Sequence, residues 1–257
     1  MLVFLIPLKS PKVAKSWELT SKLFERCVKS VCNQTSSDYQ VIVICHEKPK
    51  IEFNHPHLEY IEVEFKPPDL TIESKRLDRE HKILRGLLHN RNSKRSCHIM
   101  AVDADDCVSK HLAQFVSRNS QANGWFLKKG YFYQENSKFI RIMRKGFDRY
   151  CGTSHIIRED LYDLPETLNE EELTKHIFNY YRHRQIQGTL AIKGIKLEPL
   201  PFAGAVYIQN GENIYLGVET KKNTIKLKSR LLRMKALLDN RLITKNIRHE
   251  FSLYNIN

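Results

Sequence analysis

Three aspartates stand close together at Asp103–Asp106, directly after the apolar run His98 to Val102. Carboxylate oxygens are hard ligands, and an Asp-x-Asp spacing can hold Mg²⁺ or Mn²⁺ against a diphosphate. Such a cation would offset the charge that develops on a leaving nucleoside diphosphate. The alternative is a solvated turn, or a cap in which Asp106 or Ser109 begins a helix near Lys110. The position of the cluster, at the end of a strand-like run, favours the metal site.

The elements around the cluster alternate between strand and helix. Apolar runs at 2–6, 41–45 and 98–102 are typical of buried strands. Apolar residues recur at helical spacing between Trp17 and Cys32, and the segment Lys75–His89 has leucines on one face and basic residues on the other. This order predicts a doubly wound α/β sheet with right-handed crossovers. From Gly124 the chain becomes aromatic and strand-like, a helix is expected at 170–185, and residues 195–207 are expected to be extended.

Ligands of such sheets bind beyond the carboxyl ends of the strands. Three strand-like runs end in polar or charged segments, at 7–9, 45–47 and 103–106. We therefore expect these three segments to form one site.

These same residues resemble a known family. The run SVCNQTSSDYQVIVICHE, beginning at Ser30, resembles the second-strand signature of family-2-type GT-A glycosyltransferases. MAVDADD at 100–106 resembles their metal-binding strand end, and LVFLIPLKS resembles their first strand with its proline turn. The resemblance covers residues 1–115 and fades beyond them. It implies the GT-A fold, a Rossmann-like, doubly wound mixed sheet that binds a nucleotide-sugar in its N-terminal half.

The resemblance also implies residue roles in nucleotide binding. The turn Pro7-Leu8-Lys9 would border the base and ribose. His46 stands where the family commonly has an aspartate that binds the uracil edge, so the identity of the base is less secure. Lys82 stands where the family has a basic residue near the nucleotide, with a solvated helix face as the alternative.

The aspartate cluster would then hold the phosphates and the metal. Asp103 would contact the ribose and take part in binding Mn²⁺ or Mg²⁺, while Asp105 would be the main metal ligand. Ala104 would line the nucleotide through its backbone. Many relatives supply a late histidine to the metal, and the matching stretch 207–213 contains none.

A general base must deprotonate the acceptor hydroxyl if the anomeric configuration is inverted, a point the sequence leaves open. Glu171, within Glu170–Glu172, is the first candidate and Asp160 the second, although three acids also suit a helix N-terminus without chemistry. Gly152 and Thr153 resemble a small-residue loop near the donor sugar, and an ordinary turn is the alternative.

Aromatic and imidazole side chains give weaker signals. Trp125 would stack on an acceptor sugar or lie in the core. His176 and His183 are interpreted as surface histidines.

The net charge and the cysteine content limit the other classes of protein to which the chain could belong. Of the net charge of +13, the stretch 221–248 supplies nine. Its leucines recur at helical spacing from Asn223 to Ile243, which predicts a basic helical extension at 221–257 after a transferase domain at 1–220, divided at residue 115. Packing on the domain is favoured over a peripheral membrane contact. No stacking motif for specific nucleic-acid binding accompanies the charge.

The six cysteines show no metal-ligand or disulfide spacing, which favours a reducing, cytoplasmic location. The opening MLVFLIPL is too short to span a bilayer and is expected to be the first strand.

Three functions remain open. The leading hypothesis is a metal-dependent hexosyltransferase that moves a sugar from a UDP-sugar to a saccharide or other hydroxyl acceptor. A nucleotidyltransferase acting on sugar phosphates is the second, although the segment after the first strand, 8–15, has no glycine-rich phosphate loop. A non-enzymatic polyanion-binding module built on residues 221–248 is the third.

Overall fold

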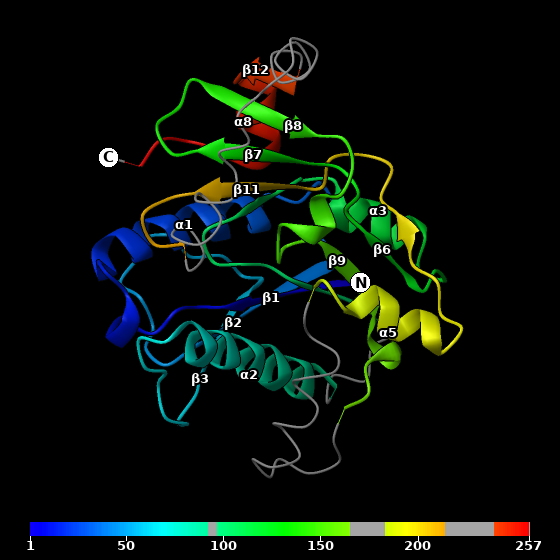
Figure 1. Ribbon diagram of the computed structural model, residues 1–257, viewed down its shortest axis with the longest axis horizontal. Coiled ribbons are helices and arrows are strands. Elements are labelled where there is room, and N and C mark those ends of the chain that lie inside the picture. The colour runs from blue at the N-terminus through cyan, green and yellow to red at the C-terminus, as the bar shows by residue number, and fades with distance from the viewer. Residues whose placement is uncertain (92–96, 165–182, 214–238, 257) are drawn as a thin grey trace, which may run out of the picture.

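The computed structural model describes residues 1–91, 97–164, 183–213 and 239–256, and Figure 1 shows their arrangement. A seven-stranded mixed sheet forms the centre of the molecule. From edge to edge its strands are β10 (Glu198–Pro199), β6 (Gly124–Phe126), β9 (His155–Arg158), β4 (His98–Ala101), β1 (Leu2–Pro7), β2 (Tyr39–Cys45) and β3 (Leu58–Glu62). The chain runs from β1 outward to β2 and β3, and then returns to β4 on the other side of β1.

The parallel strands β3, β2, β1 and β4 are joined by helices on both faces, while β9 runs antiparallel to β4 and β6. Alternate residues of β1 explain the layers. Phe4 and Ile6 pack with α1 (Trp17–Cys32) and α3 (Leu112–Arg118), whereas Val3 and Leu5 pack with α2 (Ile72–Arg91) and α5 (Ile186–Ile192). Every residue of β1 is buried, as expected of a central parallel strand. The predicted α/β class with a doubly wound mixed sheet is confirmed.

A second sheet of five strands lies beside the first. Its order is β12 (Asn240–Leu242), β8 (Phe139–Met143), β7 (Gly130–Gln134), β11 (Ala205–Gln209) and β5 (Cys107–Val108). The short β5 follows the aspartate cluster directly and pairs antiparallel with β11. This pairing ties the cluster to a strand about a hundred residues later in the chain.

The C-terminal residues are part of this second layer. Phe251, at the end of α8 (Lys245–Phe251), and Leu253 are buried against strands of the second sheet. The backbone carbonyl of Tyr254 accepts a hydrogen bond from Arg26 of α1 at 2.7 Å. Residues 214–238 lie outside the described residues, and they include most of the predicted basic helix from Asn223 to Ile243.

The predicted helix is wrong at its end, because Asn240–Leu242 form strand β12 against β8. The helical spacing of the leucines does not bury Leu242, which is 62% exposed. Backbone pairing along the open edge of β8 is the stronger local interaction.

Two further expectations can be compared with the structure. All six cysteines are buried and free in the structure. No helix in the described ranges combines the length and the hydrophobicity needed to span a bilayer.

Candidate functional site

A cleft of about 660 Å³ opens at the carboxyl ends of β1 and β4. After β1 the chain continues to β2, toward one edge of the sheet, and after β4 it continues to β6 and β9, toward the other edge. The cleft therefore lies at the topological switch point, where open α/β sheets bind ligands. Six of the predicted residues line it: Pro7, Lys9, Asp103, Ala104, Asp105 and Gly152. The expectation that the polar segments after the first and third apolar runs meet is confirmed.

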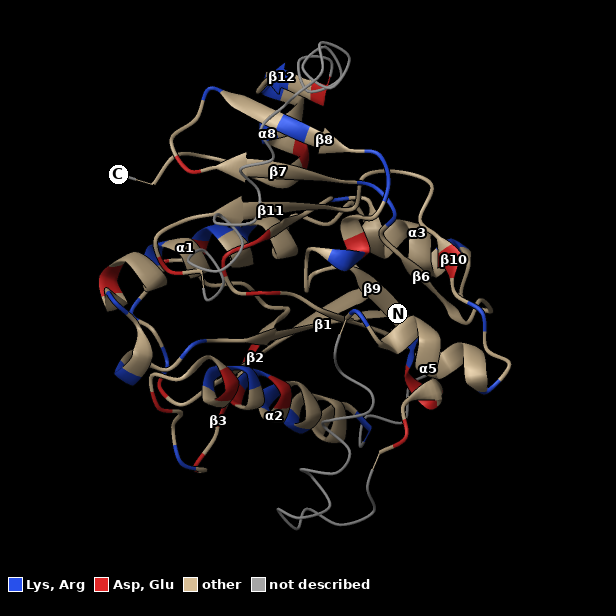
Figure 2. Cartoon of the chain, in the orientation of Figure 1, with Lys and Arg blue, Asp and Glu red and all other residues tan. Residues whose placement is uncertain are grey.

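One wall of the cleft is the polar face of α2, and Figure 2 shows acidic and basic residues crowded along the first half of this helix. Lys75, Asp78 and Arg79 line the cleft from this face. Lys82 is one turn further along and is 0% exposed. Its ammonium donates to Asp78 Oδ2 at 2.6 Å and to the carbonyl of Leu8 at 2.8 Å. This face of the helix is therefore a cleft wall and not the solvated face given as the alternative, but Lys82 itself does not line the cleft.

His46 belongs to the same buried network. Its Nε2 lies 2.6 Å from Asp78 Oδ1 and donates to that carboxylate. Burial lowers the pKa of His46 and the pKa of Lys82, and Asp78 acts in the opposite direction on both. His46, Lys82 and the side chain of Leu8 thus lie behind the cleft wall, and Asp78 is the member of the network that reaches the cleft.

The opposite wall is the aspartate cluster, and its innermost member is Asp106. This carboxylate is fully buried and accepts from Thr153 Oγ1 at 2.7 Å, from Cys151 Sγ at 3.2 Å and from the backbone N–H of Ile208 at 3.1 Å. Burial, and then the charges of the other two aspartates, raise its pKa well above the ordinary value. Asp106 joins three segments and is neither a helix cap nor a solvated residue.

Thr153 lies with Asp106 behind the cleft surface. Its hydroxyl donates to Asp106 and accepts from the backbone N–H of Asp103 at 2.9 Å. Ser109, the other predicted cap, accepts from the N–H of His111 at 3.3 Å just before α3.

Asp103 is 27% exposed and pairs with Arg79, whose Nε donates to Asp103 Oδ1 at 2.6 Å. Gly152 packs against this pair. A Cβ at Gly152 would lie 2.4 Å from Asp103 Oδ2 and 2.8 Å from a terminal nitrogen of Arg79. Only glycine at this position lets the loop approach the ion pair so closely.

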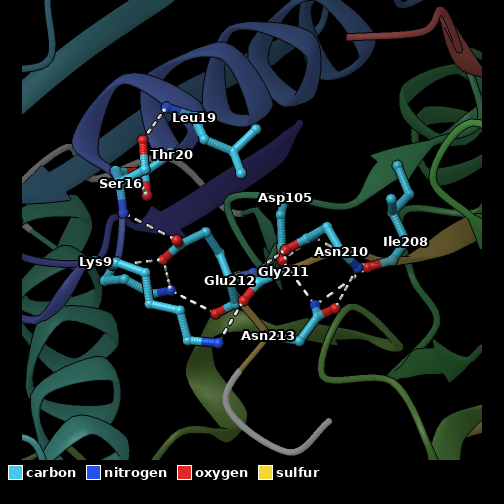
Figure 3. Close-up of polar contacts among 11 residues, drawn as sticks. Lys9, Ser16, Leu19, Thr20, Asp105, Ile208, Asn210, Gly211, Glu212 and Asn213 are labelled. Atoms are coloured by element: carbon cyan, nitrogen blue, oxygen red, sulfur yellow. Dashed lines mark hydrogen bonds and ion pairs between the residues drawn. The ribbon is translucent and has the colours of Figure 1, made fainter. Parts of the chain in front are cut away.

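Asp105 contacts the segment that follows β11, as Figure 3 shows. Its Oδ2 accepts from the side-chain amides of Asn210 at 2.8 Å and Asn213 at 2.9 Å. The orientation of both amides is set by their other contacts, because each Oδ1 accepts from a backbone N–H, that of Glu212 and that of Asn210 respectively. Burial and the charge of Asp103 raise the pKa of Asp105, and Asn210 and Lys9 oppose them.

Glu212 closes the same loop onto the start of α1 (Figure 3). Its carboxylate accepts from the backbone N–H groups of Lys15 at 3.1 Å and Ser16 at 3.0 Å, and from Lys9 Nζ at 3.1 Å. Burial alone would raise the pKa of Glu212, but these donors lower it below the ordinary value. The segment 210–213 therefore bridges the cleft from Asp105 to the turn after β1.

Tyr150 and His183 line the cleft together with Gly152. His183 is not a surface histidine. Burial and the charge of Arg79 lower its pKa to about 4, its ring hydrogen-bonds to the backbone of Arg149, and its buried Nε2 has no partner in the described chain. His176 lies outside the described residues.

Asp160 and Trp125 are not brought to the cleft. Asp160 is 63% exposed and pairs with Arg158 at 2.6 Å. β9 runs antiparallel to β4, with Arg158 opposite His98, the first residue of β4. Asp160 therefore lies at the amino-terminal end of β4, whereas the cleft lies at its carboxyl end. Trp125 is buried against His98 and Phe115 and belongs to the core. Glu171 lies outside the described residues.

Sequence reasoning missed Arg79 and Asp78. The spacing of Lys75, Arg79 and Lys82 places them on one helix face, which could have indicated a shared wall. The resemblance matches 207–213 to a segment near the metal, but it does not predict that Asn210 and Asn213 donate to Asp105.

The fit of a divalent cation can be judged from these contacts. Mg²⁺ is usually held by one or two carboxylates together with phosphate oxygens. Here Asp105 Oδ2 is occupied by two amide groups, while Asp103 has Arg79 on Oδ1 and Gly152 against Oδ2. The described residues bring no three His, Cys, Asp or Glu side chains together at an ion-binding spacing. This donor set does not fit a cation shared by Asp103 and Asp105.

Comparisons with known proteins give structural similarities only. No protein-family model and no curated protein matches the chain. A solved structure of 2-C-methyl-D-erythritol 4-phosphate cytidylyltransferase from Francisella tularensis is 12% identical, with 86% of this chain and 95% of that one covered and a TM-score of 0.40. Residues 1–349 of S. aureus TarS, in complex with UDP-GlcNAc, are 10% identical over 84% of this chain and 60% of that one, with a TM-score of 0.44. At this level of similarity the argument about function depends on the site itself.

Proposed function

We propose that the chain is a glycosyltransferase of the GT-A kind that moves a sugar from a nucleotide-sugar, with a uridine diphosphate donor, to an acceptor hydroxyl. The observation that carries the proposal is the cleft at the switch point of β1 and β4, with Lys9 on one side and Asp103–Asp105 on the other. Its volume of about 660 Å³ suits a ligand of this size.

The two ends of the cleft suit the two parts of such a donor. Pro7, Val13 and Leu23 form an apolar end beside the turn after β1, where a base and ribose would bind. Gly152, Tyr150 and His183 form the other end, where the sugar and the acceptor would meet. Between them lie the charged groups that a diphosphate would contact.

The reaction breaks the bond between the anomeric carbon and the β-phosphate oxygen, which keeps the electron pair. The acceptor oxygen bonds to the carbon, and its proton passes to a general base. Glu171 stays a prediction for that role, and the position of Asp160 does not support it. Metal dependence stays a prediction from the resemblance, and the contacts of Asp103 and Asp105 do not support it.

The two alternatives find less support. A nucleotidyltransferase with a phosphate loop after β1 would use the backbone N–H groups at the start of α1. Those of Lys15 and Ser16 are occupied by Glu212. A polyanion-binding module would depend on residues 221–248, most of which lie outside the described chain. The same holds for a peripheral membrane contact of that segment.

The test is calorimetric titration with a panel of uridine diphosphate hexoses, followed by assay of sugar transfer to saccharide acceptors. We expect one donor to bind and Asp103→Ala to weaken it at least about tenfold, since one ion-pair partner at the cleft is lost. Asp160→Ala is the matched control, because this aspartate is also ion-paired but lies at the amino-terminal end of β4, away from the cleft. If no donor binds the wild-type protein, or if both variants lose binding equally, the proposal is wrong.

A further inference from the structure

We propose that the diphosphate of the donor is held by cationic side chains of the cleft, chiefly Arg79 and Lys9, and that transfer does not require a divalent cation. The inference rests on the proposed function and concerns the same site. It starts from the misfit between the aspartates and a shared cation, and it asks what else in the cleft can offset the charge of a diphosphate.

Arg79 has the geometry for this task. Only its Nε is used, in the contact with Asp103 Oδ1, while its terminal nitrogens have no hydrogen-bond partner in the described part of the chain. The side chain is 20% exposed and lines the cleft. A guanidinium fixed at Nε presents its remaining N–H groups in a rigid fork, which matches two phosphate oxygens. Asp103 thus orients Arg79.

Lys9 provides a second fixed positive charge in the cleft. Its ammonium donates to the backbone carbonyl of Glu212 at 2.5 Å and to the Glu212 carboxylate at 3.1 Å. An ammonium has three donors, so one remains for a ligand. Lys9 lines the cleft and is 20% exposed. Glu212 therefore positions Lys9 as Asp103 positions Arg79.

Lys75 adds a third positive charge on the same wall. It lies one helical turn before Arg79 on α2, lines the cleft, and has no side-chain partner among the described residues. Lys82, one turn after Arg79, is buried with Asp78 and cannot take part.

These charges match the charge that develops during transfer. The electron pair of the broken glycosidic bond stays on the β-phosphate oxygen, and fixed cations beside that oxygen stabilise the leaving diphosphate without rearranging. The role of Asp105 differs from that of a metal ligand: by accepting from Asn210 and Asn213, it holds the loop that carries Glu212, and through it Lys9.

The experiment measures binding of uridine diphosphate and uridine monophosphate to the full chain, in EDTA and in Mn²⁺. We expect the dissociation constant for the diphosphate to change by less than about twofold between the two conditions. Arg79→Gln is expected to weaken the diphosphate by about 30-fold, the effect of losing charge-assisted hydrogen bonds, and the monophosphate much less. Arg85→Gln, on the same helix but not on the cleft, is the matched control and should change neither.

The outcomes separate this inference from the proposed function. Diphosphate binding that tightens at least about tenfold in Mn²⁺, or that Arg79→Gln leaves unchanged, overturns the inference and leaves the transferase proposal standing. Sugar transfer that occurs in Mn²⁺ and stops in EDTA does the same. A protein that binds neither nucleotide in either condition contradicts both. Calorimetry with Mn²⁺ alone, for which we expect no binding, supplies a readout independent of activity.

Discussion

The two walls of the cleft, the face of α2 with both acidic and basic residues and the aspartate cluster, are built alike. On α2, Lys82 is fully buried with Asp78, while Arg79 and Lys75 reach the cleft. In the aspartate cluster, Asp106 is fully buried among three donors, while Asp103 and Asp105 reach the cleft.

In each wall the innermost charge is fully buried and holds the structure together, while the outer charges line the cleft. The comparison teaches that depth separates structural from ligand-facing residues, whereas residue type does not. The predictions below test that distinction.

The largest effect is expected from Lys82→Met. Removing the ammonium leaves Asp78 as a buried carboxylate with only His46 beside it. Breaking a buried ion pair from one side should lower the free energy of unfolding by about 3–5 kcal/mol. Lys75→Met, at the outer end of the same face, should change it by less than about 0.5 kcal/mol. Urea denaturation of both variants measures the difference. Equal stabilities would show that the buried lysine of this wall stabilises the fold no more than the cleft-lining one.

A somewhat smaller effect is expected from Asp106→Ala. The hydroxyl of Thr153 and the N–H of Ile208 lose their buried acceptor, which should cost about 2–4 kcal/mol of unfolding free energy. Asp105→Ala, at the cleft surface, should cost about 1 kcal/mol, since the amides of Asn210 and Asn213 also donate to the carbonyl of Ile208 and keep that acceptor. Thermal unfolding of the pair is the measurement. A greater loss for Asp105→Ala would reverse the assignment of the structural and the exposed aspartate.

The smallest effect concerns Glu212 in the segment 210–213, which bridges the cleft from Asp105 to the turn after β1, and it depends on pH. The pKa of Glu212 lies below its ordinary 4.5 in the folded protein, because Lys15, Lys9 and Ser16 favour the carboxylate. Its ionised form therefore stabilises the protein above about pH 4.5, and this contribution is lost as pH falls through the lower, folded pKa.

Melting temperatures of wild type and Glu212→Gln should accordingly differ at pH 7 and converge in acid. A constant difference across that range would mean that the carboxylate charge does not hold the bridge.

Part of this site could be predicted from the sequence, because the signals for that part come from residues that are neighbours in the chain. The apolar strands and the polar residues that end them are contiguous in the chain, so Lys9 and Asp103–Asp105 could be placed at one edge of one sheet. His46 is predicted to contact the base, but its ring contacts Asp78, a partner on another element, and does not line the cleft. The same kind of distant partner makes Lys82 a buried residue where its helix spacing indicated solvent.

The sequence by itself determined that this chain forms a doubly wound α/β sheet whose strands end in carboxylates and a lysine. Periodicity and strand-end chemistry depend only on neighbouring residues, so they can be read without coordinates. The tertiary structure alone decided what each charge faces: Arg79 on Asp103, two asparagines on Asp105 and Glu212 on Lys9. These pairs join segments 24 to 203 residues apart, and the energy of a charge depends on its nearest partner and its burial, which only the folded chain fixes.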